Sequence, residues 1–161
     1  MKGLDISVSE KYKLLVNQIE SLISIDEPAI SNISNITAAL KQTFSKFSWV
    51  GFYFVLKDDL FLGPFQGSVA CSKIMFGRGV CGTAAESKST QIVSNVHKFP
   101  GHIACDPEAN SEIVIPVIQN GIVKAVLDID SPKFSRFTQS DKEYLEQIID
   151  IFILNTKFTD L

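Results

Sequence analysis

The chain has 161 residues, of which 45% are hydrophobic and 20% charged, a composition that excludes a disordered protein and suits one globular domain over residues 1–161. Its net charge of −3 comes without a basic stripe, which argues against nucleic acid as a partner. No apolar run approaches the roughly 20 residues needed to cross a bilayer, and the polar N-terminus is no secretory signal, so we expect a cytoplasmic protein with no membrane partner.

Two helices are predicted over about residues 8–44. The first is indicated by apolar residues at helical spacing between Tyr12 and Ile25, namely Leu15, Ile19, Leu22 and Ile23. Pro28 stands where a second helix can begin, because proline is favoured at the first helical position. The buried face predicted for this second helix consists of apolar residues: Ile30, Ile33, Ile36, Leu40 and Phe44.

Residues of about 46–131 are predicted to form a sheet and the loops that carry the candidate site. Aromatic and β-branched residues in SWVGFYFVL and LFLGPF indicate two strands joined by a turn at Asp58 and Asp59. The segments CSKIMF and QIV are shorter strand candidates on either side of a Gly-rich turn and helix, GRGVCGTAAESKS. The segments SEIVIPVI and IVKAVLDID form a hairpin, whose Asn120-Gly121 turn favours type I′.

The last predicted helix covers about residues 138–157 and begins after Thr138, which can cap it. Its charged residues point outward and its apolar residues point inward: Tyr144, Leu145, Ile148, Ile149 and Phe152. Two helices, strands in hairpins and a final helix predict an α+β domain, with a central, largely antiparallel sheet and helices packed on one face.

The three cysteines of the chain lie between positions 71 and 105, in the contexts VACS, GVCGTAA and IACD. Thiols stay reduced in a cytosolic protein, so clustered cysteines there indicate chemistry more often than cross-links. Cys105 lies in a long loop from Ser94 to Asn110, near His102, whose positive charge would raise the thiolate fraction. Any one cysteine can instead be a core residue, and Cys81 suits that interpretation best. The spacing contains no Cys-x-x-Cys or His-x-x-x-His pair and so predicts no metal site.

Acidic residues gather in the predicted hairpin. Asp128 and Asp130 are two positions apart on one strand, so both side chains point to the same face as apolar Val126. Counting from the turn places Glu112 roughly opposite Asp128. Burial and mutual repulsion would raise the pKa of at least one of these acids and keep it protonated near neutrality. The simpler alternatives are that Asp130 caps a turn and that Glu112 is an exposed charge.

Several segments resemble one known family, in family order, over about residues 45–135. They are WVGFY, LGPFQG, VAC ending at Cys71, GRGVCGTA, GHIACD, SEIVIP and VLDIDS. Together they are similar to the free methionine-(R)-sulfoxide reductases, which are built on a GAF domain. The three cysteines within their motifs, together with SEIV and DIDS, make this resemblance specific.

The resemblance implies a GAF-like fold, usually as a homodimer, and a pocket for one free amino acid, L-methionine (R)-sulfoxide. It implies that Cys105 is the nucleophile, Cys71 the resolving thiol and Cys81 a secondary resolving thiol. The implied substrate pocket is lined by acids and by two aromatic residues that share a strand face: Glu112, Asp128, Asp130, Trp49 and Tyr53. The two aromatic residues can also be plain core.

In the implied reaction Glu112 or Asp130 protonates the sulfoxide oxygen and Cys105 becomes a sulfenic acid, which a nearby thiol converts to a disulfide. Cys71 can do this if its Cα lies within about 7 Å of that of Cys105. Thioredoxin would then reduce the disulfide, and no cofactor is needed. Two alternatives are a ligand-sensing GAF module, which needs no paired cysteines, and a thiol peroxidase, which needs no acidic amino-acid pocket.

Overall fold

The computed structural model describes residues 6–158 of the chain. Its strands are β1 (Trp49–Leu56), β2 (Asp59–Gln66), β3 (Lys73–Met75), β4 (Gln91–Val93), β5 (Ser111–Gln119) and β6 (Ile122–Ser131). Its helices are α1 (Val8–Leu22), α2 (Ala29–Thr43), α3 (Gly79–Ser87), the 3₁₀ turn η1 (Val96–Lys98) and α4 (Gln139–Leu154). The described strands form one six-stranded antiparallel sheet with the order β3-β2-β1-β6-β5-β4. The predicted α+β class with a largely antiparallel sheet is therefore confirmed.

Two of the three long helices, α1 and α4, begin at residues that satisfy their free N-terminal amides. At α1 the Ser7 side chain accepts from the Glu10 backbone, and the Glu10 carboxylate accepts from Ser7 in return. Thr138 and Asp141 form the same capping box at α4. Pro28 directly precedes α2, as its sequence position predicted. Helices α1 and α4 end at residues 22 and 154, short of the predicted ends at 25 and 157.

One residue assigned to a buried helix face is exposed instead. Ile30 keeps 45% of its surface exposed, so that prediction was wrong, and Leu22, which helped to indicate the first helix, is 41% exposed. Leu22 is the last residue of α1 and Ile30 the second of α2. Their neighbours Ile23 and Ala29 are buried, so the two exposed side chains lie on the outward faces of these helix ends.

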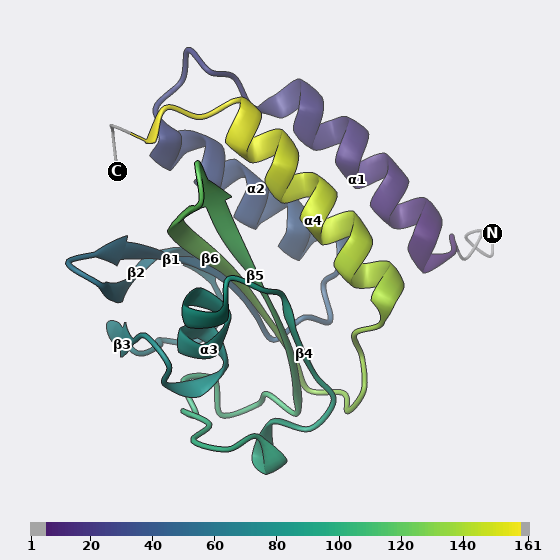
Figure 1. Ribbon diagram of the computed structural model, residues 1–161. Helices are drawn as coiled ribbons and strands as arrows, with labels where there is room; N and C mark the ends of the chain where they lie inside the picture. The colour runs from purple at the N-terminus through teal and green to yellow at the C-terminus, as the bar shows by residue number, and fades with distance from the viewer. Residues whose placement is uncertain (1–5, 159–161) are drawn as a thin grey trace.

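The sheet separates two apolar clusters, because alternate residues of each strand point to opposite faces. The face under α1, α2 and α4 carries residues of the larger cluster: Val50, Phe52, Ile113, Ile115, Leu127 and Ile129. The other face, under α3, carries those of the smaller cluster: Trp49, Tyr53, Val114 and Val126. Figure 1 shows the three long helices together on one side of the sheet and α3 on the other. The three long helices therefore pack on one face as predicted, and the short helix α3 covers the other.

The hairpin of β5 and β6 sets the positions of the acidic residues. Its turn residues Asn120 and Gly121 both have positive φ, 53° and 75°, as the predicted type I′ turn requires. A register shift at Val117 leaves Lys124 as an extra residue on β6 and pairs Glu112 with Asp130. The prediction of Glu112 opposite Asp128 was wrong. Without the bulge, Glu112 would point to the helix face.

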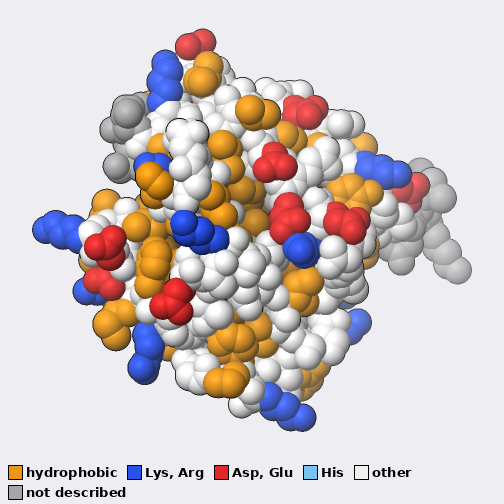
Figure 2. Space-filling view, viewed as in Figure 1, with side chains coloured by type: hydrophobic (Ala, Val, Ile, Leu, Met, Phe, Trp, Pro, Cys, Tyr) orange, Lys and Arg blue, Asp and Glu red, His pale blue; other side chains and the backbone are white. Residues whose placement is uncertain are grey.

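The outer surface carries charges of both signs. On the face shown in Figure 2, basic and acidic side chains are interspersed among apolar and uncharged ones. Within residues 6–158, no helix combines the length and apolar character that a membrane span requires.

Candidate active site

Two of the three cysteines form a disulfide at the edge of the smaller cluster. Cys71, between β2 and β3, is bonded to Cys105 in the long loop before β5, and their Cα atoms are 5.3 Å apart. This separation lies within the limit that a Cys71–Cys105 bond requires. Both residues are half-buried, so the bond can be reached from outside. The structure therefore describes the oxidised state of this pair.

Three acidic side chains lie beneath this bond on the α3 side of the sheet. Glu112, Asp128 and Asp130 are only 6%, 5% and 5% exposed. Burial raises the pKa of Glu112 and Asp130 well above their ordinary values, and the charge of Asp128 adds to both shifts. Burial also raises the pKa of Asp128 to about 7, although nearby donors on Cys81 and Glu112 limit the rise. The cluster can therefore hold protons at neutral pH.

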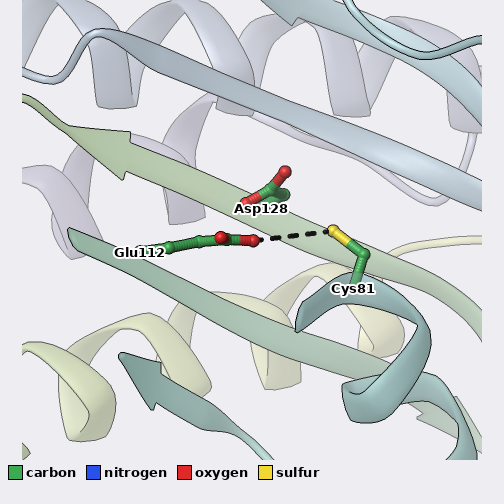
Figure 3. Close-up of side chains that lie close together, drawn as sticks. All are labelled: Cys81, Glu112 and Asp128. Atoms are coloured by element: carbon green, nitrogen blue, oxygen red, sulfur yellow. Dashed lines mark hydrogen bonds between the residues drawn. The ribbon is translucent and has the colours of Figure 1, made fainter. Parts of the chain in front are cut away.

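Cys81 reaches the same acids from α3. Positive φ angles of 73° at Gly77 and 62° at Gly79 shape the turn into the helix. Gly82 lets the helix pack closely, because a side chain there would collide with the carbonyl oxygen of Met75. The Cys81 Sγ lies 4.0 Å from Glu112 Oε1 (Figure 3). Burial, followed by the charges of Asp128 and Glu112, raises the pKa of this thiol, so it remains protonated.

His102 contacts the acid cluster from the long loop. Its Nε2 lies 4.0 Å from Glu112 Oε2, and its side chain is 15% exposed. Burial, and then the charge of His97, lowers the pKa of His102. A lowered pKa reduces the imidazolium fraction, so His102 is poorly suited to stabilise a thiolate at Cys105 by charge. Its place beside Glu112 suits proton exchange instead, and no sequence signal indicated this contact.

The two aromatic residues lie beside the acids on β1. Trp49 pairs with Asp130, and Gly51, between the two aromatic residues, pairs with Asp128. The rings of Trp49 and Tyr53 are stacked with centroids 5.9 Å apart, and both side chains are buried. The Tyr53 hydroxyl finds no hydrogen-bond partner among residues 6–158. This unpaired hydroxyl leaves a donor available near the acid cluster.

A cavity of about 20 Å³ joins the disulfide to the acids. Its walls include residues named from the sequence: Cys81, Cys105, Glu112, Asp128 and Asp130. Trp49, Tyr53 and Cys71 are not part of this lining. Space of this size holds about one water molecule and no amino acid. The oxidised state is thus closed around its acid cluster.

The cavity also contains residues to which the sequence assigned no role. Asp106, beside Cys105, is 5% exposed, and its Oδ2 has no hydrogen-bond partner among the described residues. Arg78, at the start of α3, also lines the cavity, together with His102, which the sequence had suggested only as a charge beside Cys105. The only feature of the sequence that could have indicated Asp106 and Arg78 is their position close to Cys105 and Cys81.

The fold and the site are those of a GAF domain, and comparison of the sequence with known families identifies the same class of protein. Residues 33–152 match the GAF domain family. Two relatives carry the name free methionine-R-sulfoxide reductase. The one from Escherichia coli is 42% identical over 88% of this chain and 86% of its own length. The one from Saccharomyces cerevisiae is 49% identical over 74% of this chain and 71% of its own.

A solved structure agrees with these relatives. The free methionine-R-sulfoxide reductase from Neisseria meningitidis, described in complex with its substrate, superposes with a TM-score of 0.87. It is 41% identical and covers 96% of this chain and 95% of its own. The chain therefore belongs to the free methionine-R-sulfoxide reductase family of GAF-domain enzymes.

Proposed function

We propose that this chain, as one GAF domain over residues 1–161, reduces free L-methionine (R)-sulfoxide to L-methionine in the cytoplasm. The observation that carries the proposal is the bond between Cys71 and Cys105, because Cys105 lines the same cavity as three buried acids. The named relatives and the substrate complex of the Neisseria protein support the same substrate. Neither a ligand sensor nor a thiol peroxidase needs both features in one cavity.

In the proposed reaction Cys105 is the nucleophile. A sulfoxide sulfur is a weak electrophile until its oxygen is protonated, after which a thiolate can attack the sulfur. The protonated oxygen then passes from the substrate sulfur to the Cys105 sulfur as the bond between the two sulfurs breaks, which leaves a sulfenic acid on Cys105 and the thioether of methionine. A second thiol then displaces hydroxide, which leaves as water, and forms the disulfide. Over both steps two thiols supply the two electrons and two protons that convert the sulfoxide oxygen to water.

The buried acids supply the proton and hold the substrate. Glu112 and Asp130 have pKa values raised by burial, so each can keep a proton at neutral pH and pass it to the sulfoxide oxygen. Asp128, with a pKa of about 7, is partly ionised there and can pair with the ammonium group of the amino acid. Trp49 and Tyr53 form the aromatic wall, where sulfur–aromatic contact contributes roughly 0.3–1.5 kcal/mol.

Cys71 is the resolving thiol in this scheme, because it already lies within bonding reach of Cys105. Cys81 is buried at Glu112 and serves as a secondary resolving thiol. Thioredoxin restores the pair by thiol–disulfide exchange at the half-buried bond. We propose a homodimer as the working form, which light scattering during gel filtration tests directly. The scheme uses no cofactor.

The decisive assay mixes the protein with dithiothreitol and free L-methionine sulfoxide of mixed sulfur configuration. Chiral chromatography should show loss of the R epimer, formation of an equal amount of methionine and survival of the S epimer. Consumption of both epimers would contradict the proposed specificity. An absence of turnover would favour the ligand sensor, and faster turnover with hydrogen peroxide would favour the thiol peroxidase.

A further inference from the structure

Three possible metal ligands meet on the α3 side of the sheet. The Sγ of Cys81 and one carboxylate oxygen each from Glu112 and Asp128 lie within 4.8 Å of one another. They come from α3, β5 and β6, and Figure 3 shows their side chains converging on a common space. All three side chains are buried. When binding displaces the protons that burial keeps on these groups and releases them to water, a thiolate with two carboxylates is a donor set that suits a borderline-soft cation such as Zn²⁺.

A second observation indicates that this cluster lacks a ligand. Asp128 is 95% buried, since its exposed fraction is 5%, and its Oδ1 accepts no hydrogen bond from any residue between 6 and 158. An unpaired carboxylate oxygen in the interior is costly, and an ion is one of the few groups that can satisfy it. The described residues around the cluster supply no cation in hydrogen-bond contact with this oxygen.

The spacing is close to that of a zinc site. Zinc bonds of about 2.0–2.3 Å place tetrahedral ligand atoms about 3.3–3.6 Å apart. Cys81 Sγ and Glu112 Oε1 are 4.0 Å apart and all three donor atoms lie within 4.8 Å of one another, so side-chain movements of about 1 Å would bring them into range. The fourth position then remains for water.

We propose that Zn²⁺ binds in this cavity through Cys81, Glu112 and Asp128 and excludes substrate from it. The cation would stand where the substrate ammonium and the transferred proton are needed. Binding itself does not depend on the proposed function, whereas the inhibitory consequence rests on it. The fold assembles the three ligands from separate elements, which explains why no metal motif is visible in the sequence.

The oxidised protein gives the cleanest test, because its Cys71–Cys105 bond leaves Cys81 as the free thiol. Calorimetry of tag-free oxidised protein with Zn²⁺ should show one site per chain. Co²⁺, which binds more weakly but is coloured, should give a thiolate charge-transfer band and the visible bands of tetrahedral coordination. Both signals should disappear when Zn²⁺ is added.

Substitutions assign the ligands. Cys81→Ser and Asp128→Asn should each weaken Zn²⁺ binding at least tenfold, while the matched control Asp150→Asn, at an exposed acid on α4, should not change it. Binding that survives both ligand substitutions, or no binding to the oxidised wild type, would overturn the proposal. If a variant loses its circular dichroism spectrum, the wild-type Co²⁺ spectrum decides, and a spectrum without the thiolate band overturns it.

Inhibition is measured separately, in a single turnover with prereduced, desalted protein. Zn²⁺ should lower the rate in the wild type and have at least about tenfold less effect in Cys81→Ser, relative to that variant's own rate without zinc. Equal inhibition of both would contradict blockade through Cys81. A protein that binds Zn²⁺ as described but reduces no sulfoxide would refute the proposed function and leave the metal site standing.

Discussion

The two faces of the sheet are built by alternate residues of the same strands, but the buried aspartates on the two sides differ in their hydrogen-bond partners. Toward the long helices, Asp141 accepts hydrogen bonds from Tyr12 Oη at 2.9 Å, Arg136 at 2.9 Å and the Thr138 backbone at 2.8 Å. On the α3 side, Asp128 lies among other acids, and its Oδ1 has no partner in the described chain. The first arrangement stabilises the fold. The second leaves an unmet requirement for a donor or cation, which a ligand can supply.

Substitution of Cys105 should abolish the reaction on the α3 side of the sheet and leave the packing on the helix side unchanged. Cys105→Ser should reduce sulfoxide turnover by at least about 10³-fold, the scale expected when a covalent nucleophile is lost. The substitution is nearly isosteric at a half-buried position, so the reduced variant should unfold at the same urea concentration as the reduced wild type. Steady-state rates and urea titrations measure both quantities.

Cys71→Ser is the matched control for Cys105→Ser. It should still form one equivalent of methionine from prereduced protein, but it should not turn over repeatedly with thioredoxin. Retained activity in Cys105→Ser would move the nucleophile elsewhere. Normal thioredoxin-driven rates in Cys71→Ser would transfer the resolving role to Cys81.

Substitutions of Asp141 and Asp128 should change the free energy of unfolding by different amounts. Asp141→Asn should lower the free energy of unfolding by about 3 kcal/mol, because it breaks a partly buried ion pair with Arg136 and weakens the α4 capping box. Asp128→Asn should cause no loss at pH 7, since it removes a carboxylate that has no countercharge. Urea denaturation of the oxidised proteins tests both, and equal losses would remove the distinction.

Glu112→Gln probes proton transfer on the α3 side. Gln keeps the shape of the side chain but has no acidic proton, so the sulfoxide step should slow by about 10²-fold, at the lower end of the range for general acid catalysis. Glu143→Gln, at an exposed position on α4, is the matched control and should retain the wild-type rate. A wild-type rate in Glu112→Gln would assign the proton to Asp130 or His102.

A further test of the α3 side is the pH dependence of stability. Asp128 keeps its proton in the folded state up to about pH 7, whereas an ordinary aspartate releases it near 3.8. The folded state binds the extra proton between these values, so the free energy of unfolding falls as pH rises through this window. One such group contributes a slope of up to about 1.4 kcal/mol per pH unit. The raised pKa values of Glu112 and Asp130 act in the same direction.

The contribution of Asp128 is isolated by comparing the variant with the wild type. The stability of Asp128→Asn relative to wild type should increase steadily from pH 4 to pH 7. Parallel curves for the two proteins over this range would contradict the assignment of a raised pKa to Asp128.

Local chemistry made much of this structure predictable from the sequence. The Asn120-Gly121 turn and the Thr138 cap act through their own backbone neighbours, so both were located correctly. Strand alternation placed Asp128 and Asp130 on one face, where the structure has them. The family motifs indicated the pairing of Cys71 with Cys105, which the structure contains.

The remaining features depend on contacts between distant segments. The extra residue Lys124 in β6 moves the partner of Glu112 by one position, from Ile129 to Asp130, and nothing in the local sequence marks such a bulge. The periodicity of the sequence does not specify which face of the sheet α3 packs against. His102 lies in a loop without a regular period, so its contact with Glu112 was not visible in advance.

The proposed reaction requires that a thiolate at position 105 reduces the sulfoxide and that the resulting sulfenic acid then forms a disulfide with a neighbouring thiol. Prereduced protein, freed of reductant, would be mixed with one equivalent of either sulfoxide epimer and digested after alkylation. The account predicts that peptide mass spectrometry detects a Cys71–Cys105 link in proportion to the methionine formed, with the R epimer and not with the S epimer. Methionine formed without any disulfide to Cys105 would contradict it.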